Sequence, residues 1–172
     1  MIAGAIGGFS IRPAESQHAA LVHAMIGELA SYENLTHLCV ASEADLRAAL
    51  WSPRPTAEVL IAWKGDLPAG FALFFHNYST FLGRRGIWLE DLFVRPAWRR
   101  QGCASDLLRA IAALAVERDC GRFEWSVLDW NAGAIDFYRG LGATVLPDWR
   151  IVRVVGPALA ALATGTRADD AG

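Results

Sequence analysis

The spacing of hydrophobic residues along this chain predicts a series of strands and helices. Strands are indicated where apolar and β-branched residues run between turn-forming residues, and helices where apolar residues recur about every three or four positions. The expected strands span 9–13, 58–63, 69–78, 87–94, 123–128 and one or two segments within 144–155. The expected helices span 14–31, 42–51, 105–119 and 131–140.

Polar residues at the ends of these segments support the same boundaries. Ser42 followed by Asp45 resembles a capping box at a helix start. Asn131 can cap the last predicted helix. The tripeptide Lys64-Gly65-Asp66 supplies a hairpin turn between two strands.

The order of these elements indicates the fold class. Three consecutive strands joined by short turns favour antiparallel pairing, whereas the later strand–helix–strand requires a parallel pair. We therefore expect an α/β fold with helices on both faces of a mixed sheet. Neither a linker nor an internal repeat interrupts the pattern, so residues 9–163 are expected to form one domain, with flexible termini at 1–8 and 164–172.

Composition excludes several classes of protein. The chain has 172 residues, 53% hydrophobic and 20% charged, which suits one folded core and is too apolar for a disordered chain. A net charge of −2 gives no basic footprint for nucleic acid. No run of about 18 apolar residues is present, so no membrane span is expected. The apolar start ends too early for a signal peptide.

The cysteines and histidines give no indication of a metal site. The cysteines are Cys39, Cys103 and Cys120. Their odd number and the absence of a C-x-x-C pair argue against a disulfide framework or zinc site, and favour a reducing cytoplasm. The histidines lack ligand spacing and are expected to be surface or loop residues. They are His18, His23, His37 and His76.

A glycine turn between a strand and a helix offers the first candidate site. It reads Arg99-Arg100-Gln101-Gly102-Cys103-Ala104. Glycine lets successive N–H groups point into one concavity, and the helix start adds unsatisfied donors and a positive dipole end, a combination that suits a pyrophosphate. The turn is neither a Walker loop nor a dinucleotide fingerprint. The alternative is an ordinary glycine turn with solvated arginines. At this helix start the pKa of Cys103 is expected to be lowered.

Three segments together resemble one family. The pattern R-x-x-G-x-[GA] after a hydrophobic strand resembles the pyrophosphate-binding segment of GNAT-type N-acetyltransferases, and residues 88–96 resemble their central strand. Residues 131–143 are similar to their N-x-x-A-x-x-F-Y-x-x-x-G-F segment, with Ala143 in place of phenylalanine. The motifs L-E-D-x-F-V and, at 28–33, E-L-A-x-Y-E resemble the diamine (spermidine/spermine) acetyltransferases in particular. The similarity runs from about Ile11 to Val155.

The resemblance implies a GNAT-like, mostly antiparallel mixed sheet that binds acetyl-CoA as co-substrate, without a metal. It implies that backbone groups of the central strand pair with pantetheine, that an N–H near Val94 serves as oxyanion donor, and that the glycine turn surrounds the pyrophosphate. Asn131 would then bond the pantetheine arm as well as cap its helix. The residues expected at the cofactor are Leu92, Phe93, Val94, Arg99, Arg100, Gln101, Gly102, Cys103, Ala104, Ser105, Asn131, Ala134 and Tyr138.

Acetylation of an amine requires a base to take a proton and benefits from an acid that protonates the leaving thiolate. By resemblance, Glu90 is the candidate base, acting through water, and Tyr138 the candidate acid. Glu90 and Asp91 are neighbours on a strand, so only one can face a given pocket unless a bulge intervenes. The alternatives are an ion-paired Glu90 and a core Tyr138.

The amine itself is less constrained by the sequence. The expected substrate residues are Tyr32, Glu33, Glu90, Asp91 and Asp148, of which the acidic ones could bind a distal ammonium. A solvated helix end is the alternative for Tyr32 and Glu33. Residues 142–149 form a shorter loop than in polyamine enzymes, and 124–126 also depart from them, so a smaller amine or a lysine analogue stays open.

Three functions remain compatible with these residues. The first is an N-acetyltransferase for a small di- or polyamine or a lysine-like amine, working by direct transfer as a cytoplasmic homodimer, without nucleic-acid or membrane partners. The second is a protein or peptide N-acetyltransferase. The third is a non-catalytic acyl-CoA-binding module, which the presence of both a candidate base and a candidate acid argues against.

Overall fold

The computed structural model describes residues 8–165, and the chain divides into two compact units at Ser126 and Val127. The first unit holds one five-stranded sheet and three α-helices. Its strands are β1 (Ser10–Pro13), β2 (Glu58–Lys64), β3 (Leu67–Ser79), β4 (Arg84–Val94) and β5 (Phe123–Trp125). Its helices are α1 (Ala19–Tyr32), α2 (Glu43–Trp51) and α3 (Cys103–Glu117), with short 3-10 turns η1 (Ser16–His18), η2 (Thr36–Leu38) and η3 (Pro96–Trp98).

The sheet is mixed and mostly antiparallel, as expected. Its strands lie in the order β1-β2-β3-β4-β5. The first three pairings are antiparallel, and β4 pairs with β5 in parallel. The parallel pair follows from α3, which carries the chain back across the sheet between β4 and β5.

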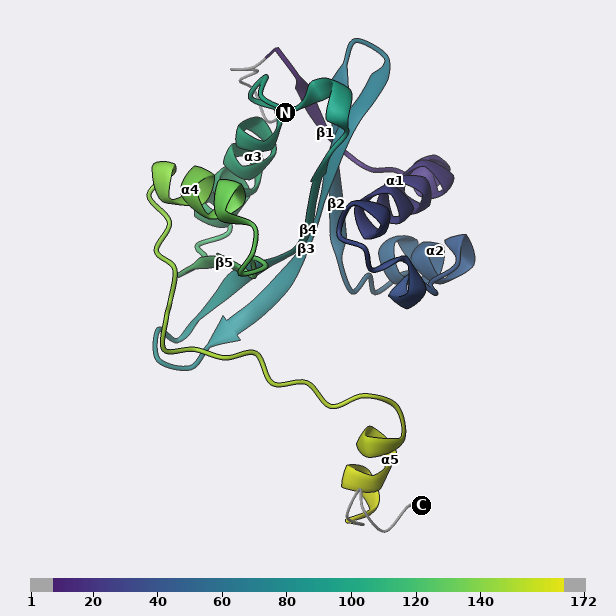
Figure 1. Ribbon diagram of the computed structural model, residues 1–172, viewed down its shortest axis with the longest axis vertical. Coiled ribbons are helices and arrows are strands. Elements are labelled where there is room, and N and C mark those ends of the chain that lie inside the picture. The colour runs from purple at the N-terminus through teal and green to yellow at the C-terminus, as the bar shows by residue number, and fades with distance from the viewer. Residues whose placement is uncertain (1–7, 166–172) are drawn as a thin grey trace. The chain divides into compact units, whose positions relative to one another are not determined.

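Helices cover both faces of this sheet (Figure 1). Helices α1 and α2 bury their apolar residues against one face, in a cluster that includes Val22, Met25, Phe71 and Phe93. Helix α3 contacts β2, β3 and β4, and Figure 1 shows it on the opposite face. The capping box predicted at Ser42 is present, since Ser42 Oγ accepts from the Asp45 N–H at 3.2 Å.

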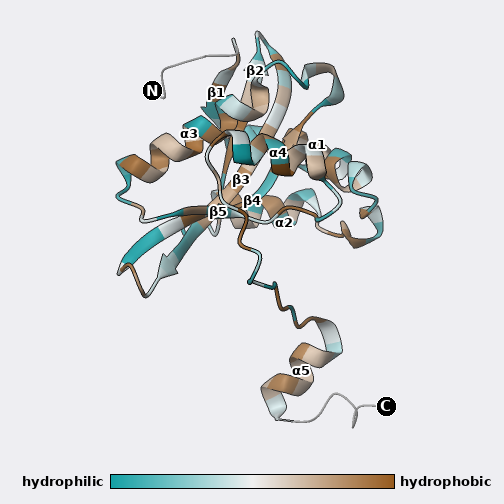
Figure 2. Cartoon of the chain, turned by 60° about the vertical axis from the view of Figure 1, so that its left-hand side comes forward, coloured by the Kyte–Doolittle hydropathy of each residue, from teal (hydrophilic) through white to brown (hydrophobic). Residues whose placement is uncertain are grey.

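The second unit holds two helices, α4 (Ala132–Gly140) and α5 (Gly156–Thr164). Helix α5, coloured mostly brown in Figure 2, was not expected from the sequence. Two residues that favour a helix at this place are a proline in its first turn and a glycine at its C-terminal end.

The strands expected within 144–155 are absent from the structure as described, and the strand expected at 123–128 stops at Trp125. Alternating apolar residues mark a segment that can pair, but a strand forms only where a neighbour completes its hydrogen bonds. Trp149, Ile151 and Val152 are instead 67–88% exposed.

The structure describes little of the two ends of the chain. The flexible termini expected at 1–8 and 164–172 lie outside the described residues, except for Gly8, Thr164 and Gly165. Within 8–165, none of the helices combines the length and hydrophobicity needed to cross a bilayer.

Candidate functional site

A β-bulge in β4 shapes the candidate acid–base site. In the pairing with β3, Asp91 lies opposite Leu73 and Leu89 lies opposite Phe74. Glu90 is therefore the extra residue that no residue of β3 matches. The bulge anticipated as one possibility for the Glu90–Asp91 pair is thus present.

The bulge changes which face each side chain occupies. Leu73 and Phe74 point to opposite faces of β3, so Asp91 shares the face of α1 and α2 while Leu89 occupies the other. Trp88 lies opposite Phe75, which is on the Leu73 face. Trp88 Nε1 donates to Glu90 Oε2 at 3.0 Å, which brings Glu90 to the same side. Both carboxylates therefore gather on one face, instead of the opposite faces that regular alternation would give.

Glu33 completes an acidic cluster with these two residues. Glu33 directly follows α1, and burial raises its pKa above the ordinary value. Burial, reinforced by the charges of Glu90 and Glu33, raises the pKa of Asp91 to about 6. The structure thus joins three of the predicted substrate residues, and gives Asp91 the pKa of a base that works near neutral pH.

The edge of β4 beyond this cluster is open toward β5. Strand β5 pairs with β4 only at Ile87, Trp88 and Leu89. Within the described strands, residues 92–94 pair on the β3 side alone. Apart from the Val94 carbonyl, which accepts from Arg99 Nε, their other edge can accept an extended ligand in the manner of an added strand. This is where pantetheine is expected.

The glycine turn has the conformation of an anion-binding loop. Arg100 and Gly102 both have positive φ, +61° and +87°, and at Gly102 that conformation strongly favours glycine. Gly102 caps α3 without any side-chain hydrogen bond, so the first amides of a 15-residue helix are left for another acceptor. The residues present therefore fit a pyrophosphate at this helix start.

Cys103 corrects one prediction. Its side chain is 1% exposed, and burial together with the Asp106 charge raises its pKa to about 12, instead of lowering it. The helix dipole is outweighed because the thiol points into the core, not toward the turn. Cys103 can reach a ligand only through its backbone N–H.

Two arginines join the end of β4 to α1. Arg95 forms hydrogen bonds to both carboxylate oxygens of Glu28, the shortest at 2.6 Å. The Arg99 guanidinium lies 4.4 Å from the centre of the Tyr32 ring, and Arg99 Nε donates to the Val94 carbonyl at 2.9 Å. Sequence analysis placed Arg99 in the glycine turn. It predicted neither the Arg95–Glu28 contact nor the Arg99–Tyr32 contact, because both depend on α1, which is far away in the chain.

Four predicted residues belong to the second unit, namely Asn131, Ala134, Tyr138 and Asp148. Asn131 caps α4 as expected, since its Oδ1 accepts from the Ala134 N–H at 3.2 Å. That contact leaves the side-chain NH₂ available to a ligand. Tyr138 is half-buried with its ring 5.3 Å from that of Phe137, and Asp148 is exposed.

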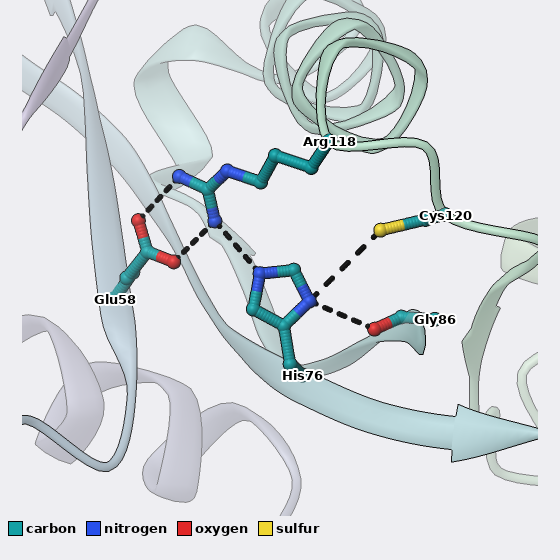
Figure 3. Close-up of polar contacts among 5 residues, drawn as sticks. All are labelled: Glu58, His76, Gly86, Arg118 and Cys120. Atoms are coloured by element: carbon teal, nitrogen blue, oxygen red, sulfur yellow. Dashed lines mark hydrogen bonds and ion pairs between the residues drawn. The ribbon is translucent and has the colours of Figure 1, made fainter. Parts of the chain in front are cut away.

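His76 is a surface residue, as expected, but it lies in strand β3 and takes part in a polar network (Figure 3). Its Nε2 lies 3.0 Å from Arg118 Nη1, and its Nδ1 lies 3.0 Å from the Gly86 carbonyl. Arginine can only donate, so Nε2 accepts and Nδ1–H donates. Arg118 also binds Glu58, with Nη2 to Oε2 at 2.8 Å, so the network fixes the end of α3 to β2, β3 and β4.

No group of three or more histidine, cysteine or acidic side chains within 8–165 is arranged to hold a metal ion. Glu124 of β5 accepts a hydrogen bond from Asn77 Nδ2 at 3.1 Å and forms an ion pair with Arg122 Nε at 2.7 Å.

Comparison with known proteins agrees with this geometry. Residues 26–143 match the acetyltransferase (GNAT) family. The chain is 35% identical to L-ornithine N5-acetyltransferase of Arabidopsis thaliana, over 88% of this chain and 86% of that protein. It is 36% identical to thialysine N-epsilon-acetyltransferase of Sus scrofa, over 89% of this chain and 96% of that protein.

Among solved structures, an integron cassette protein from V. cholerae is similar, with a TM-score of 0.77 and 26% identity, over 91% of this chain and 98% of that one. The bulged strand, the open edge and the glycine turn all fall within the matched family region. The chain therefore belongs to the GNAT family and is an acetyl-CoA-dependent N-acetyltransferase.

Proposed function

We propose that this enzyme acetylates the terminal primary amine of a small molecule that carries a second charged group, such as ornithine or a lysine analogue. The observation that carries the proposal is the acidic cluster of Glu33, Glu90 and Asp91 beside the bulge of β4. A diamine or diamino acid at neutral pH brings ammonium groups that such a cluster attracts.

Asp91 and Glu90 share the work of proton removal in this proposal. The ammonium must lose a proton before its nitrogen can attack the thioester carbonyl. A carboxylate with a pKa of about 6 accepts that proton more readily than an ordinary aspartate does. Glu90, held by Trp88, is exposed and can relay the proton through water.

The other partners in the transfer are assigned by sequence resemblance. As the C–N bond forms and the C–S bond breaks, the oxyanion accepts a hydrogen bond from a backbone N–H near Val94. Tyr138 donates a proton to the leaving thiolate. The pyrophosphate is held by the amides that follow Gly102 and by Arg100, and Asn131 contacts the pantetheine arm.

The names of the two relatives favour the side-chain amine of a free amino acid, and not a long polyamine, as the substrate. Their names assign acetylation to N5 of ornithine and to the ε-nitrogen of thialysine. Both amines are short and carry an α-amino acid group. The short loop at 142–149 and the altered residues of β5 agree with a smaller substrate than spermidine.

We also propose a homodimer in the cytoplasm. The exposed Trp149, Ile151 and Val152 form an apolar stretch of the kind that is covered in an assembly. Cys39, Cys103 and Cys120 are free thiols, as is usual in a reducing compartment.

Thiol release from acetyl-CoA tests the proposed substrate class. The amines would be L-ornithine, thialysine, lysine, spermidine and a lysine-containing peptide. We expect ornithine or thialysine to give the highest kcat/KM. A preference for the peptide would support a protein acetyltransferase instead, and CoA binding without amine-stimulated release would support a non-catalytic module.

A further inference from the structure

Helix α1 reaches the end of β4 through two contacts that are one helical turn apart. Glu28 and Tyr32 are four residues apart and therefore lie on one face of α1. Arg95 binds Glu28, and the Arg99 guanidinium lies over the Tyr32 ring. The two arginines are therefore four residues apart, as are their two partners on α1. Arg95 also donates to the Pro68 carbonyl at 3.1 Å, which fixes it to β3.

Three neighbours hold the side chain of Arg99 in this contact. Its guanidinium lies 4.4 Å from the Tyr32 ring centre and 5.9 Å from that of Phe93, and its Nε bonds to the Val94 carbonyl. A guanidinium stacked on an aromatic ring is attracted by the ring's negative face. Arg100, its neighbour in the turn, is exposed instead.

We propose that Arg99 is a positioning residue for the amine subsite and not a side-chain ligand of the pyrophosphate. It holds Tyr32, and with it the end of α1 that presents Glu33 to Asp91. This inference rests on the proposed function, because Tyr32 and Glu33 are taken to contact the amine. The two adjacent arginines then have different roles: Arg99 positions the amine subsite, and Arg100 binds the cofactor.

Steady-state kinetics with both substrates varied separate these roles. The variants are Arg99→Leu, Arg99→Lys and Arg100→Leu, with L-ornithine as the amine, or thialysine if that is the better substrate. We expect Arg99→Leu to raise the KM for the amine about fivefold while the KM for acetyl-CoA and the calorimetric Kd for CoA change less than about twofold. Arg99→Lys keeps the cation and restores part of the loss. Arg100→Leu shows the reverse pattern.

A double-mutant cycle tests whether Arg99 acts through Tyr32. Tyr32→Phe keeps the ring and is expected to preserve the effect of Arg99→Leu, whereas in a Tyr32→Leu background Arg99→Leu adds nothing further. Arg84→Leu is the matched control, because it removes an exposed arginine whose partner, Asp119, is also exposed. Additive effects of Arg99→Leu and Tyr32→Leu would overturn the inference.

Amide hydrogen exchange keeps the test independent of the substrate. The N–H groups of Glu33 and Leu35 bond to the Leu29 and Ala30 carbonyls at 3.0 and 2.8 Å. Arg99→Leu and Tyr32→Leu should both accelerate exchange at these amides. Unchanged exchange, or a weakened Kd for CoA with an unchanged KM for the amine, would contradict the role assigned to Arg99. A wild-type enzyme inactive on all the amines would instead refute the proposed function and leave the exchange test in force.

Discussion

At the scale of single residues, one extra position in β4 decides what two neighbouring carboxylates can do. Without the bulge, Glu90 and Asp91 would face opposite sides of the sheet. With it, they share a face with the Glu33 side of α1, and their mutual repulsion adds to burial in raising the pKa of Asp91. The proposed base therefore depends on backbone register as much as on residue type.

Asp91→Asn is predicted to remove the acidic limb of the pH profile. In the wild type, kcat/KM should fall as pH drops below about 6, because Asp91 becomes protonated. The variant should lose about 100-fold in kcat and show no such limb. Glu90→Gln serves as the comparison: if it abolishes the limb and Asp91→Asn does not, Glu90 is the base.

The same substitution has a predicted effect on stability. A carboxyl with a raised folded-state pKa favours folding only while it is protonated, so its contribution is complete below the unfolded pKa and is lost as pH rises through about 6. An asparagine side chain stays neutral at every pH, so Asp91→Asn should increase the free energy of unfolding at pH 7 by about 2–3 kcal/mol. Urea titrations should show that this gain disappears near about pH 3.5. An equal gain in the free energy of unfolding at both pH values would contradict this prediction.

At the scale of elements, α3 is held at its two ends by different means. Its start is left open for a ligand by Gly102, which has no side chain to cap it. Its end is tied to the sheet by Arg118 through Glu58 and His76 (Figure 3). A helix anchored at the far end can present its first amides in a fixed place.

Gly102→Ala is predicted to weaken cofactor binding. A non-glycine residue at φ +87° is strained by about 1–2 kcal/mol, so the turn should either relax or destabilise the fold. We expect a higher KM for acetyl-CoA with the KM for the amine little changed. Gly27→Ala is the control, since an added Cβ there meets no atom within 4 Å beyond its chain neighbours and its own helix backbone, and it should leave both KM values unaltered.

Arg118→Gln is predicted to destabilise the protein in a pH-dependent way. The Arg118 hydrogen bonds hold the pKa of Glu58 below its ordinary value, so their contribution is present above the unfolded pKa and is lost as pH falls through the folded pKa. Because Glu58 is partly exposed, the loss should be about 1 kcal/mol at pH 7. Urea unfolding should show this loss shrinking below about pH 4. Arg84→Gln should lower the free energy of unfolding by less than about 0.5 kcal/mol at either pH. A loss as large as that of Arg118→Gln would contradict the stabilising role of the Arg118 network.

At the scale of the whole molecule, the proposed homodimer rests on exposed apolar residues of the second unit. Ile151 is 67% exposed and Val152 is 88% exposed, within a segment whose alternation is typical of a strand. Such a segment becomes a strand when it meets a sheet edge, in its own chain or in another.

Light scattering is predicted to give twice the 18.7 kDa mass of one chain. Replacing both Ile151 and Val152 by aspartate should produce a monomer, because two charges would be buried at the interface. Val116→Asp, at an 82% exposed position of α3, should leave the dimer intact. A wild-type monomer at micromolar concentration would refute the proposed assembly.

Much of the fold was open to prediction because its signals are local. The capping box at Ser42, the N-cap at Asn131 and the strands β1 to β4 depend on residues within a few positions of one another. The strands expected at 144–155 were predicted wrongly for the described structure, because an alternating pattern records the ability to pair and not the presence of a neighbour.

The sequence by itself determined the order of elements, the glycine turn and the family motifs, since these are written in short stretches of chain. Only the tertiary structure decided the bulge at Glu90, the raised pKa of Asp91, the buried thiol of Cys103 and the stacking of Arg99 on Tyr32. The bulge depends on the pairing register between β3 and β4. The other three depend on burial or on charges and rings from distant segments, which only folding brings together.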